Sequence, residues 1–301
     1  MQELTALLRE AAGDNCIFEK ENMKNHTTFR IGGPADMFAA PVTEEGVANV
    51  VRICREKNYP FYVLGNGSNL LVSDEGYRGL ILQLYRNFSE ITVEGEEITV
   101  QAGAMLSVIA KRALEHGLTG FEFASGIPGT IGGAVVMNAG AYGGEMKDVL
   151  TEVTVLTQDN EIITVPAKEL DLGYRHSVVP EKGWIVLGAK LRLAAGDTDA
   201  IRARMEELKE QRVTKQPLEY PSAGSTFKRP EGYFAGKLIQ DAGLRGFSVG
   251  DAQVSEKHCG FVVNKGNATA ADVLELMKQV SEKVKEQFGV TLEPEVKLLG
   301  M

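Results

Sequence analysis

The stretch GIPGTIGGAVVMNAGAYGGE, residues 126–145, contains seven of the chain's 33 glycines, and its first charged residue is Glu145. Glycine lets a backbone approach a ligand closely, and it also saves space in a buried turn. The stretch is therefore either a phosphate cradle or a packing turn. Its spacing, Gly129-Thr-Ile-Gly132-Gly133, does not match GxGxxG, so a classical dinucleotide fold is not supported.

A second glycine loop, VLGNGSNLL at residues 63–71, follows a short apolar segment. Gly65 and Gly67 permit positive φ, and Ser68 and Asn69 can donate hydrogen bonds to an anionic oxygen. One such loop is equally well explained as a tight turn. Two of them in the same half of the chain favour a pyrophosphate held between two backbone loops.

Short strands interspersed with isolated helices predict an α+β fold rather than regular βαβ repetition. The expected elements are helix 43–58, strand 61–65, hairpin 91–100, helix 107–116, hairpin 152–165, strand 184–193, an exposed charged helix 199–212 and helix 269–287. The change in composition near residue 195 predicts a boundary between a domain at 1–195 and another at 196–301.

Composition excludes several classes of protein. The net charge is −9 without basic runs, which argues against nucleic acid as a partner. No apolar run reaches the roughly 20 residues needed to cross a bilayer, and the N-terminus lacks the pattern of a signal peptide. The three cysteines, Cys16, Cys54 and Cys259, indicate neither a disulfide framework nor a metal site. We expect a cytoplasmic monomer that binds no membrane.

A series of motifs spread over nearly the whole chain resembles the UDP-N-acetylenolpyruvoylglucosamine reductase family. These motifs are HTTFRIGGPAD (26–36), VLGNGSNLLV (63–72), GIPGTIGGAVVMNAGAYG (126–143), GYRHS (173–177), SAGSTFKRP (222–230), LIQDAGLRGFSVGDAQVSEKHCGFVVN (238–264) and LEPEV (292–296). The resemblance implies an FAD-binding fold of the vanillyl-alcohol-oxidase type, with α+β subdomains at about 20–85 and 86–195. Residues 196–301 would form an α+β substrate domain.

The resemblance also implies the reaction and its cofactors. NADPH would reduce a non-covalent FAD lying between two subdomains. The flavin N5 would then deliver hydride to C3 of UDP-N-acetylglucosamine enolpyruvate, giving UDP-N-acetylmuramate for peptidoglycan synthesis. The expected cofactor-binding residues are Leu64, Gly65, Asn66, Gly67, Ser68, Asn69, Gly126, Ile127, Pro128, Gly129, Gly132, Asn138, Gly140, Ala141 and Gly143. Among the glycines we expect Gly129 and Gly140 to approach the cofactor closely, and Gly144 to serve a simple turn.

Three residues match the family's catalytic positions. Ser225 would protonate C2 of the substrate, and Arg175 would hold its carboxylate in bidentate geometry. Glu295, in LEPEV, would hydrogen-bond the developing enolate when protonated and assist Ser225. Glu293 is the alternative, because alternation along a strand would point it the same way. Taken singly, Ser225 could be a turn hydroxyl and Arg175 a surface ion-pair partner.

The substrate's diphosphate calls for cations, and Lys215 and Lys228 are the expected contacts, with Tyr142 near the flavin edge. Each lysine could instead be a solvated surface residue. Arg229 stands where the family pattern has a polar amide, which puts the substrate contact of that position in doubt. No long insertion lies between residues 175 and 215, so this chain resembles the shorter subtype, in which another element must cover the substrate.

Two other functions stay open at this point. The same fold can carry an FAD-dependent oxidoreductase that acts on another hydroxy acid or alcohol. A flavin-free protein that only binds a nucleotide sugar is the other possibility, and the visible absorbance of flavin separates it from both enzymes.

Overall fold

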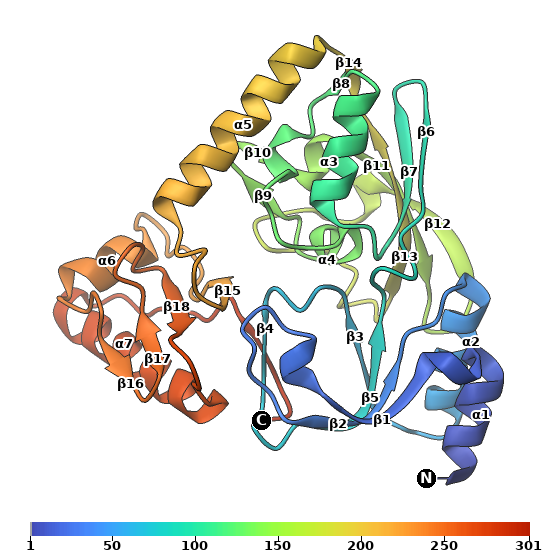
Figure 1. Cartoon of the computed structure of the whole chain (residues 1–301), viewed down its shortest axis with the longest axis horizontal. Coiled ribbons are helices and arrows are strands. Elements are labelled where there is room, and N and C mark those ends of the chain that lie inside the picture. The colour runs from blue at the N-terminus through green and yellow to red at the C-terminus, as the bar shows by residue number, and fades with distance from the viewer. Residues whose placement is uncertain (1) are drawn as a thin grey trace. The chain divides into compact units, whose positions relative to one another are not determined.

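The computed structural model describes residues 2–301 and divides them into two compact units (Figure 1). The first unit contains the chain up to Glu19 together with Met37–Asn66 and Gly79–Arg212, and the second contains Lys20–Asp36, Gly67–Arg78 and Val213–Met301. Each unit has its own hydrophobic core. No helix within residues 2–301 is long and apolar enough to cross a membrane. The mixture of helices and strands confirms the predicted α+β class.

The glycine loop at residues 65–69 leaves the end of a strand in a four-stranded sheet of order β1-β2-β5-β3. The strands are β1 (Ile17–Asn22), β2 (Pro34–Ala39), β5 (Tyr77–Gln83) and β3 (Phe61–Leu64). Strands β3 and β5 are parallel, and Leu64 lies opposite Gln83. Helix α2 (Glu44–Glu56) begins at Thr43, whose Oγ1 accepts a hydrogen bond from the Gly46 N–H, and packs against α1 (Gln2–Ala12). The predicted helix 43–58 and strand 61–65 are thus confirmed.

A five-stranded antiparallel sheet of order β12-β11-β13-β7-β6 forms the rest of the first unit's framework. The strands are β12 (Ile162–Pro166), β11 (Leu150–Leu156), β13 (Ile185–Arg192), β7 (Glu97–Gln101) and β6 (Ile91–Glu94). Both predicted hairpins are present in it. Helix α4 (Ile131–Val136) contacts β13 and β7, and α3 (Leu106–Glu115) ends just before Gly117, whose φ of 64° suits the residue after a helix.

The second unit combines a four-stranded antiparallel sheet with helices. Its order is β15-β18-β17-β16, from β15 (Ser222–Ser225), β18 (Phe261–Asn264), β17 (Ala252–Val254) and β16 (Ser248–Val249). Helices α6 (Ala235–Asp241) and α7 (Ala270–Phe288) contact each other, and β19 (Lys297–Leu299) pairs in parallel with β4 (Leu70–Val72). Helix α7 begins with a capping box of Thr269 and Asp272 and ends at Gly289 in the left-handed conformation, as predicted.

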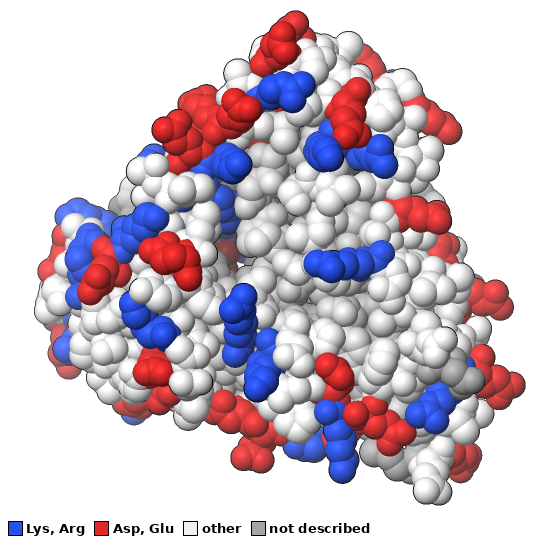
Figure 2. All heavy atoms as spheres, in the orientation of Figure 1, with Lys and Arg blue, Asp and Glu red and all other residues white. Residues whose placement is uncertain are grey.

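Helix α5 (Thr198–Lys215) is the exposed charged helix expected from the sequence. Figure 2 shows acidic side chains along its visible side. The helix is not wholly solvated, however, because Ile201 and Leu208 are buried and Met205 packs on the first core. The two compact units divide the chain after Arg212, within this helix. The predicted boundary at residue 195 stays a proposal.

The three cysteines are free, and Cys54, in α2, is fully buried. Burial raises the pKa of the Cys54 thiol to about 12. We therefore expect Cys54 to resist a thiol-specific disulfide reagent at pH 8 in the native protein, and to react once denaturant unfolds the chain. Cys16, which is partly exposed, is the internal comparison. Mass spectrometry of the labelled peptides measures both, and rapid native labelling of Cys54 would contradict the buried assignment.

Candidate active site

The loop after β3, residues 65–69, offers a run of free backbone donors. Within residues 2–301, no protein acceptor takes a hydrogen bond from the backbone N–H of any of these five residues. Gly67 has a φ of 63°, and a Cβ on it would lie 2.1 Å from the carbonyl oxygen of His26. No other residue fits there. Successive unpaired N–H groups in a glycine turn form a concave site for an anion.

The glycine stretch 126–145 lies against residues 65 and 66 of this loop. The Asn66 side-chain amide donates a 2.8 Å hydrogen bond to the Pro128 carbonyl oxygen. A Cβ on Gly65 would lie 2.4 Å from Thr130 Oγ1, so only glycine permits this approach. The sequence predicted two backbone loops that act together, and these contacts place residues 65–66 beside residues 128–130.

The second half of the stretch is a small hairpin of β9 (Gly140–Ala141) and β10 (Gly144–Glu145). Its free turn is Tyr142-Gly143, with φ values of 53° and 88°, and nothing lies within 4 Å of a Cβ on Gly143. A Cβ on Gly144 would lie 2.7 Å from the Phe123 ring. Gly144 thus saves space beside the Phe123 ring directly after the turn, which agrees with the expectation that it serves the turn.

Two further predicted cofactor contacts are used inside the protein. A Cβ on Gly140 would lie 2.7 Å from the Gly144 carbonyl oxygen, so the hairpin itself requires glycine there. Asn138 is buried, and its amide donates to Glu145 Oε2 at 2.7 Å and to the Gly173 carbonyl oxygen at 3.1 Å. Its side chain therefore joins the glycine hairpin to the GYRHS segment. Any contact of these residues with a cofactor stays a prediction.

Arg175 lies in a tight turn of the GYRHS segment. The backbones of Gly173 and His176 exchange two hydrogen bonds of 3.2 Å, with Tyr174 and Arg175 between them. Arg175 has a φ of 54°, which is uncommon for a residue other than glycine. Its guanidinium carbon lies 5.1 Å from the centroid of the Tyr174 ring. Backbone strain of this kind persists where surrounding structure enforces it, which is common at functional sites.

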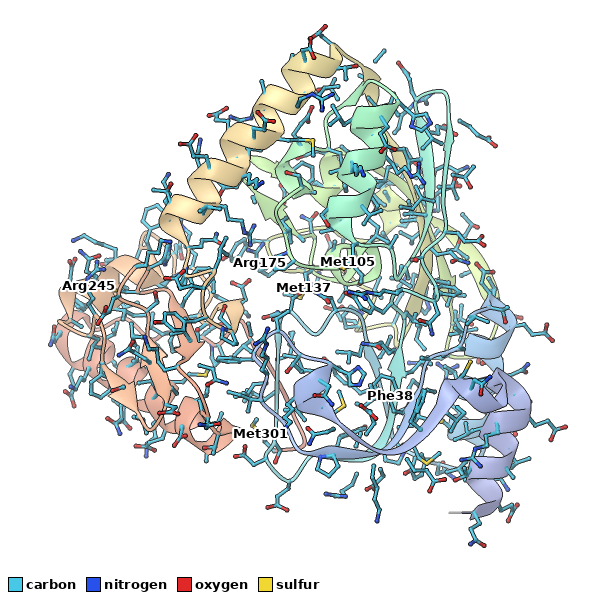
Figure 3. The ribbon with its side chains drawn as sticks, in the orientation of Figure 1. Phe38, Met105, Met137, Arg175, Arg245 and Met301 are labelled. Atoms are coloured by element: carbon cyan, nitrogen blue, oxygen red, sulfur yellow. The ribbon has the colours of Figure 1, made fainter. Side chains whose placement is uncertain are left out.

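The surroundings that hold this turn come from the end of α4. The buried hydroxyl of Ser177 donates a 2.8 Å hydrogen bond to the Val136 carbonyl oxygen. Asn138 adds its bond to Gly173. Figure 3 accordingly shows Arg175 near Met137, the residue that follows α4. The side chain of Arg175 is therefore presented by the same part of the first unit as the glycine hairpin.

Ser225 is the last residue of β15, at an irregular end of the strand. Ser222 pairs with Val263 and Ser225 with Phe261, and the register shifts between the two pairs. Gly224, in the shifted segment, has a φ of 74° and open space around it. The irregularity leaves Ser225 exposed at a defined point of an otherwise packed sheet.

A hydrogen-bonded bridge brings the LEPEV segment to Ser225. The next residue, Thr226, is buried, and its carbonyl oxygen accepts a 2.8 Å hydrogen bond from the Glu295 N–H. Asn69, from the glycine loop at residues 65–69, donates a hydrogen bond from its side-chain amide to the Glu295 carbonyl oxygen at 3.2 Å. Within the second unit, the serine, the glutamate and one end of the glycine loop are thus mutually fixed. This contact uses one of the two N–H groups of the Asn69 side-chain amide.

Glu295, the expected catalytic residue, and Glu293, its alternative, have different surroundings. Glu293 forms an ion pair with Lys228, whose Nζ lies 3.3 Å from Glu293 Oε2, and its side chain is 70% exposed. Glu295 is partly buried. The predicted substrate contacts Lys215 and Lys228 both belong to the second unit, Lys215 being exposed at the end of α5. Arg229 lies over the Phe234 ring, 3.9 Å from its centroid.

Arg212 is a residue that the sequence interpretation missed. It was included with the solvated surface of helix 199–212, whereas its side chain is half-buried against Gly126. Ile201, Met205, Leu208 and Arg212 recur at intervals of four, three and four, and this helical periodicity was the available signal. The contact connects α5 to the start of the glycine stretch.

Histidines and acidic residues do not suggest a metal. Within residues 2–301, no group of three or more His, Cys, Asp and Glu side chains is placed to hold a metal ion. His26 Nε2 lies 2.9 Å from Glu21, and His176 Nε2 lies 3.3 Å from Asp171. Burial lowers the pKa of His258, which packs edge-on to the Phe261 ring. These contacts give each of these three histidines a structural explanation.

The site fits FAD on two observations. The five free N–H groups of residues 65–69 match the oxygens of a diphosphate. The hydrogen bond from Asn66 to Pro128 keeps residues 65–66 beside the start of the glycine stretch 126–145, and a Cβ on Gly65 would meet Thr130 Oγ1, so this close approach requires glycine. The assignment of residues 64–69 and 126–143 to the cofactor stays a proposal.

Comparison with known proteins agrees with this geometry. An FAD binding domain model matches residues 35–166, and a model described as the C-terminal domain of UDP-N-acetylenolpyruvoylglucosamine reductase matches residues 216–299. A glucose oxidase variant of Phl p 4 shares the fold alone, with a TM-score of 0.51 at 13% identity over 65% of this chain and 44% of that one. The FAD-binding fold expected from the motifs is confirmed.

Two more complete matches are reductases. The UDP-N-acetylenolpyruvoylglucosamine reductase of Agathobacter rectalis is 60% identical over 296 residues, which cover 94% of each chain. The crystal structure of the enzyme of that name from Thermus caldophilus has a TM-score of 0.81 at 39% identity, covering 93% of this chain and 97% of that one. On this evidence, the chain belongs to the UDP-N-acetylenolpyruvoylglucosamine reductase family.

Proposed function

We propose that this chain reduces UDP-N-acetylglucosamine enolpyruvate to UDP-N-acetylmuramate, and that Ser225 supplies the proton. The chain is an FAD-containing oxidoreductase of peptidoglycan precursor synthesis, with NADPH as its reductant. The observation that carries the proton assignment is the hydrogen bond from the Glu295 N–H to the carbonyl oxygen of Thr226, next to Ser225. It supports a shared task for the two side chains.

The chemistry that bound FAD would supply is hydride transfer, from NADPH to the substrate carbon C3. Hydride addition at C3 leaves the electron pair of the former double bond at C2, delocalised into the carboxylate. Arg175 binds that carboxylate, because a guanidinium matches its two oxygens and its growing negative charge. Ser225 Oγ gives its proton to C2, which completes the lactyl ether. Exposure of Ser225 lets water return the proton.

Glu295 and the lysines complete the proposed site. A protonated Glu295 carboxyl would donate a hydrogen bond to the developing enolate, and Lys215 and Lys228 would neutralise the diphosphate. The ion pair with Glu293 keeps Lys228 beside the LEPEV segment. Tyr142, at the open turn of the glycine hairpin, is proposed to contact the bound sugar nucleotide.

The decisive assay follows the two half-reactions separately. We expect the purified protein to show the visible absorbance of flavin, to be bleached by NADPH, and to regain its colour only when the enolpyruvyl UDP-sugar is added. Reduction without reoxidation by this sugar would defeat the proposed substrate. A colourless protein that does not take up FAD would indicate a protein that only binds a nucleotide sugar.

The chain is further proposed to act as a monomer in the cytoplasm. Its three cysteines are free, which suits a reducing compartment. Size-exclusion chromatography with light scattering tests the first statement against the chain mass of 32.6 kDa. Cell fractionation tests the second.

A further inference from the structure

Helix α5 directs one charged side chain inward. Ile201 and Leu208 are buried on this helix and Met205 packs on the first core, and Arg212 follows at the next turn of the same helix face. The basic residues on the other faces are exposed, Arg202 among them. A guanidinium at the end of an apolar stripe is unusual, because arginine is seldom removed from water without a partner.

No such partner contacts the Arg212 guanidinium among the residues that the structure describes. Within residues 2–301 it forms neither a hydrogen bond nor an ion pair, although Glu206, Glu207 and Glu210 lie on the same helix. Burial lowers the pKa of Arg212, and the neighbouring Tyr142 acts in the opposite direction. The positive charge is therefore partly desolvated and uncompensated, an arrangement that becomes favourable when an anion binds beside it.

The position of Arg212 indicates which anion this is. A Cβ on Gly126 would lie 3.1 Å from the arginine Cδ and 3.4 Å from one terminal nitrogen, so the side chain lies flat on the first glycine of the stretch. Tyr142, from the open turn of the hairpin, approaches the same guanidinium. Both ends of the predicted cofactor stretch, residues 126–143, thus converge on this single charge.

We propose that Arg212 binds the negative charge of FAD, at the glycine stretch that begins with Gly126. FAD offers two anionic groups of the kind a guanidinium recognises, the diphosphate and the pyrimidine edge of the reduced flavin, where charge accumulates at N1 and the C2 oxygen. On the diphosphate, Arg212 would retain the cofactor. At the pyrimidine edge, it would also make the flavin easier to reduce. This inference rests on the FAD chemistry of the proposed function.

The test uses the full chain as Arg212→Gln and Arg212→Lys, with Arg202→Gln as the matched control on the same helix. Apoprotein is titrated with FAD, and the midpoint potential and sulfite affinity of the reconstituted flavin are measured. We expect Arg212→Gln to bind FAD about 10- to 100-fold more weakly, the effect of losing a hydrogen bond to a charged group. Arg212→Lys should retain most of the affinity, and Arg202→Gln should match the parent.

The potential identifies the group. Weaker FAD binding with an unchanged potential indicates the diphosphate. A potential more negative by at least about 30 mV, which is about tenfold in preference for the two-electron-reduced form, indicates the pyrimidine edge. Weaker binding of sulfite would accompany it, since the adduct is anionic. If Arg212→Gln keeps the FAD affinity and the midpoint potential of the parent, the proposal is overturned. This holds even if the variant raises the KM for the UDP-sugar.

Gly126→Ala provides an independent variant if Arg212→Gln fails to fold. The added methyl group requires the arginine to move by a few tenths of an ångström while the charge is kept, so FAD affinity should fall less than in Arg212→Gln. Parental FAD affinity and potential in Gly126→Ala as well would overturn the assignment. If the parent protein itself neither binds FAD nor is reduced by NADPH, the proposed function fails instead. The failure of the Arg212 proposal is therefore distinguishable from the failure of the proposed function.

Discussion

Replacement of Ser225 by alanine is expected to leave flavin reduction by NADPH intact and to slow reoxidation by the enolpyruvyl UDP-sugar roughly 10²–10⁴-fold. The first half-reaction requires no proton donor at the substrate. The second requires one at C2, and the alanine methyl group has no proton to give. Stopped-flow absorbance of the flavin measures each half-reaction separately.

The matched control for this variant is Ser222→Ala, in the same strand. Ser222 pairs with Val263 three residues before the irregular end of β15, and its carbonyl oxygen, which alanine keeps, accepts the Thr28 hydroxyl. We expect parental rates in both half-reactions. Equal damage to both half-reactions by Ser225→Ala would remove Ser225 as the proton donor, since it would indicate a general disturbance of the site.

Local patterns were sufficient for much of the fold. Helix α7 combines a capping box at Thr269, helical periodicity and a glycine stop at Gly289, so all local preferences agree. The hairpins at 91–100 and 152–165 alternate around polar centres, which defines strands without tertiary information. The glycine loops were recognisable because few other residues allow a positive φ and a close backbone approach.

The roles of individual glycines could not be predicted, because they depend on what lies opposite. Gly143 and Gly144 are neighbours in the sequence, yet one faces open space and the other faces the Phe123 ring. Arg212 was missed for a similar reason. The apolar period of helix α5 runs on to Arg212, but the contact with Gly126 that half-buries this arginine is visible only in the structure.

The interleaving of the two units was also beyond sequence patterns. Phe29, Ile31 and Leu71 belong to the core of the second unit, although most of that unit lies after residue 213. Apolar periodicity assigns a residue to a buried face but does not say which core receives it. Long-range pairings such as β4 with β19 decide this, and neither strand carries a signal for the other.

Replacement of Glu295 by glutamine is expected to slow flavin reoxidation roughly 10²–10³-fold, the usual effect of losing one group that stabilises charge in a transition state. Glutamine keeps the size of the side chain but has no carboxyl proton to share. The Glu295 N–H should still bond to the Thr226 carbonyl oxygen, so the backbone near Ser225 is preserved. Reduction by NADPH should be unchanged, as in Ser225→Ala.

Glu293→Gln is the control that the structure provides, two residues away in the same segment. Its ion pair with Lys228 is exposed, and exposed pairs contribute about 0–1 kcal/mol, so the reoxidation rate at saturating substrate should stay within about fivefold of the parent. Release of Lys228 should act on the KM for the UDP-sugar instead. If Glu293→Gln loses much of the reoxidation rate while Glu295→Gln keeps the parental rate, the assignment is reversed.

The double variant Ser225→Ala/Glu295→Gln then tests cooperation between the two residues. If both serve one proton transfer, the double variant should slow reoxidation by less than the product of the two separate effects.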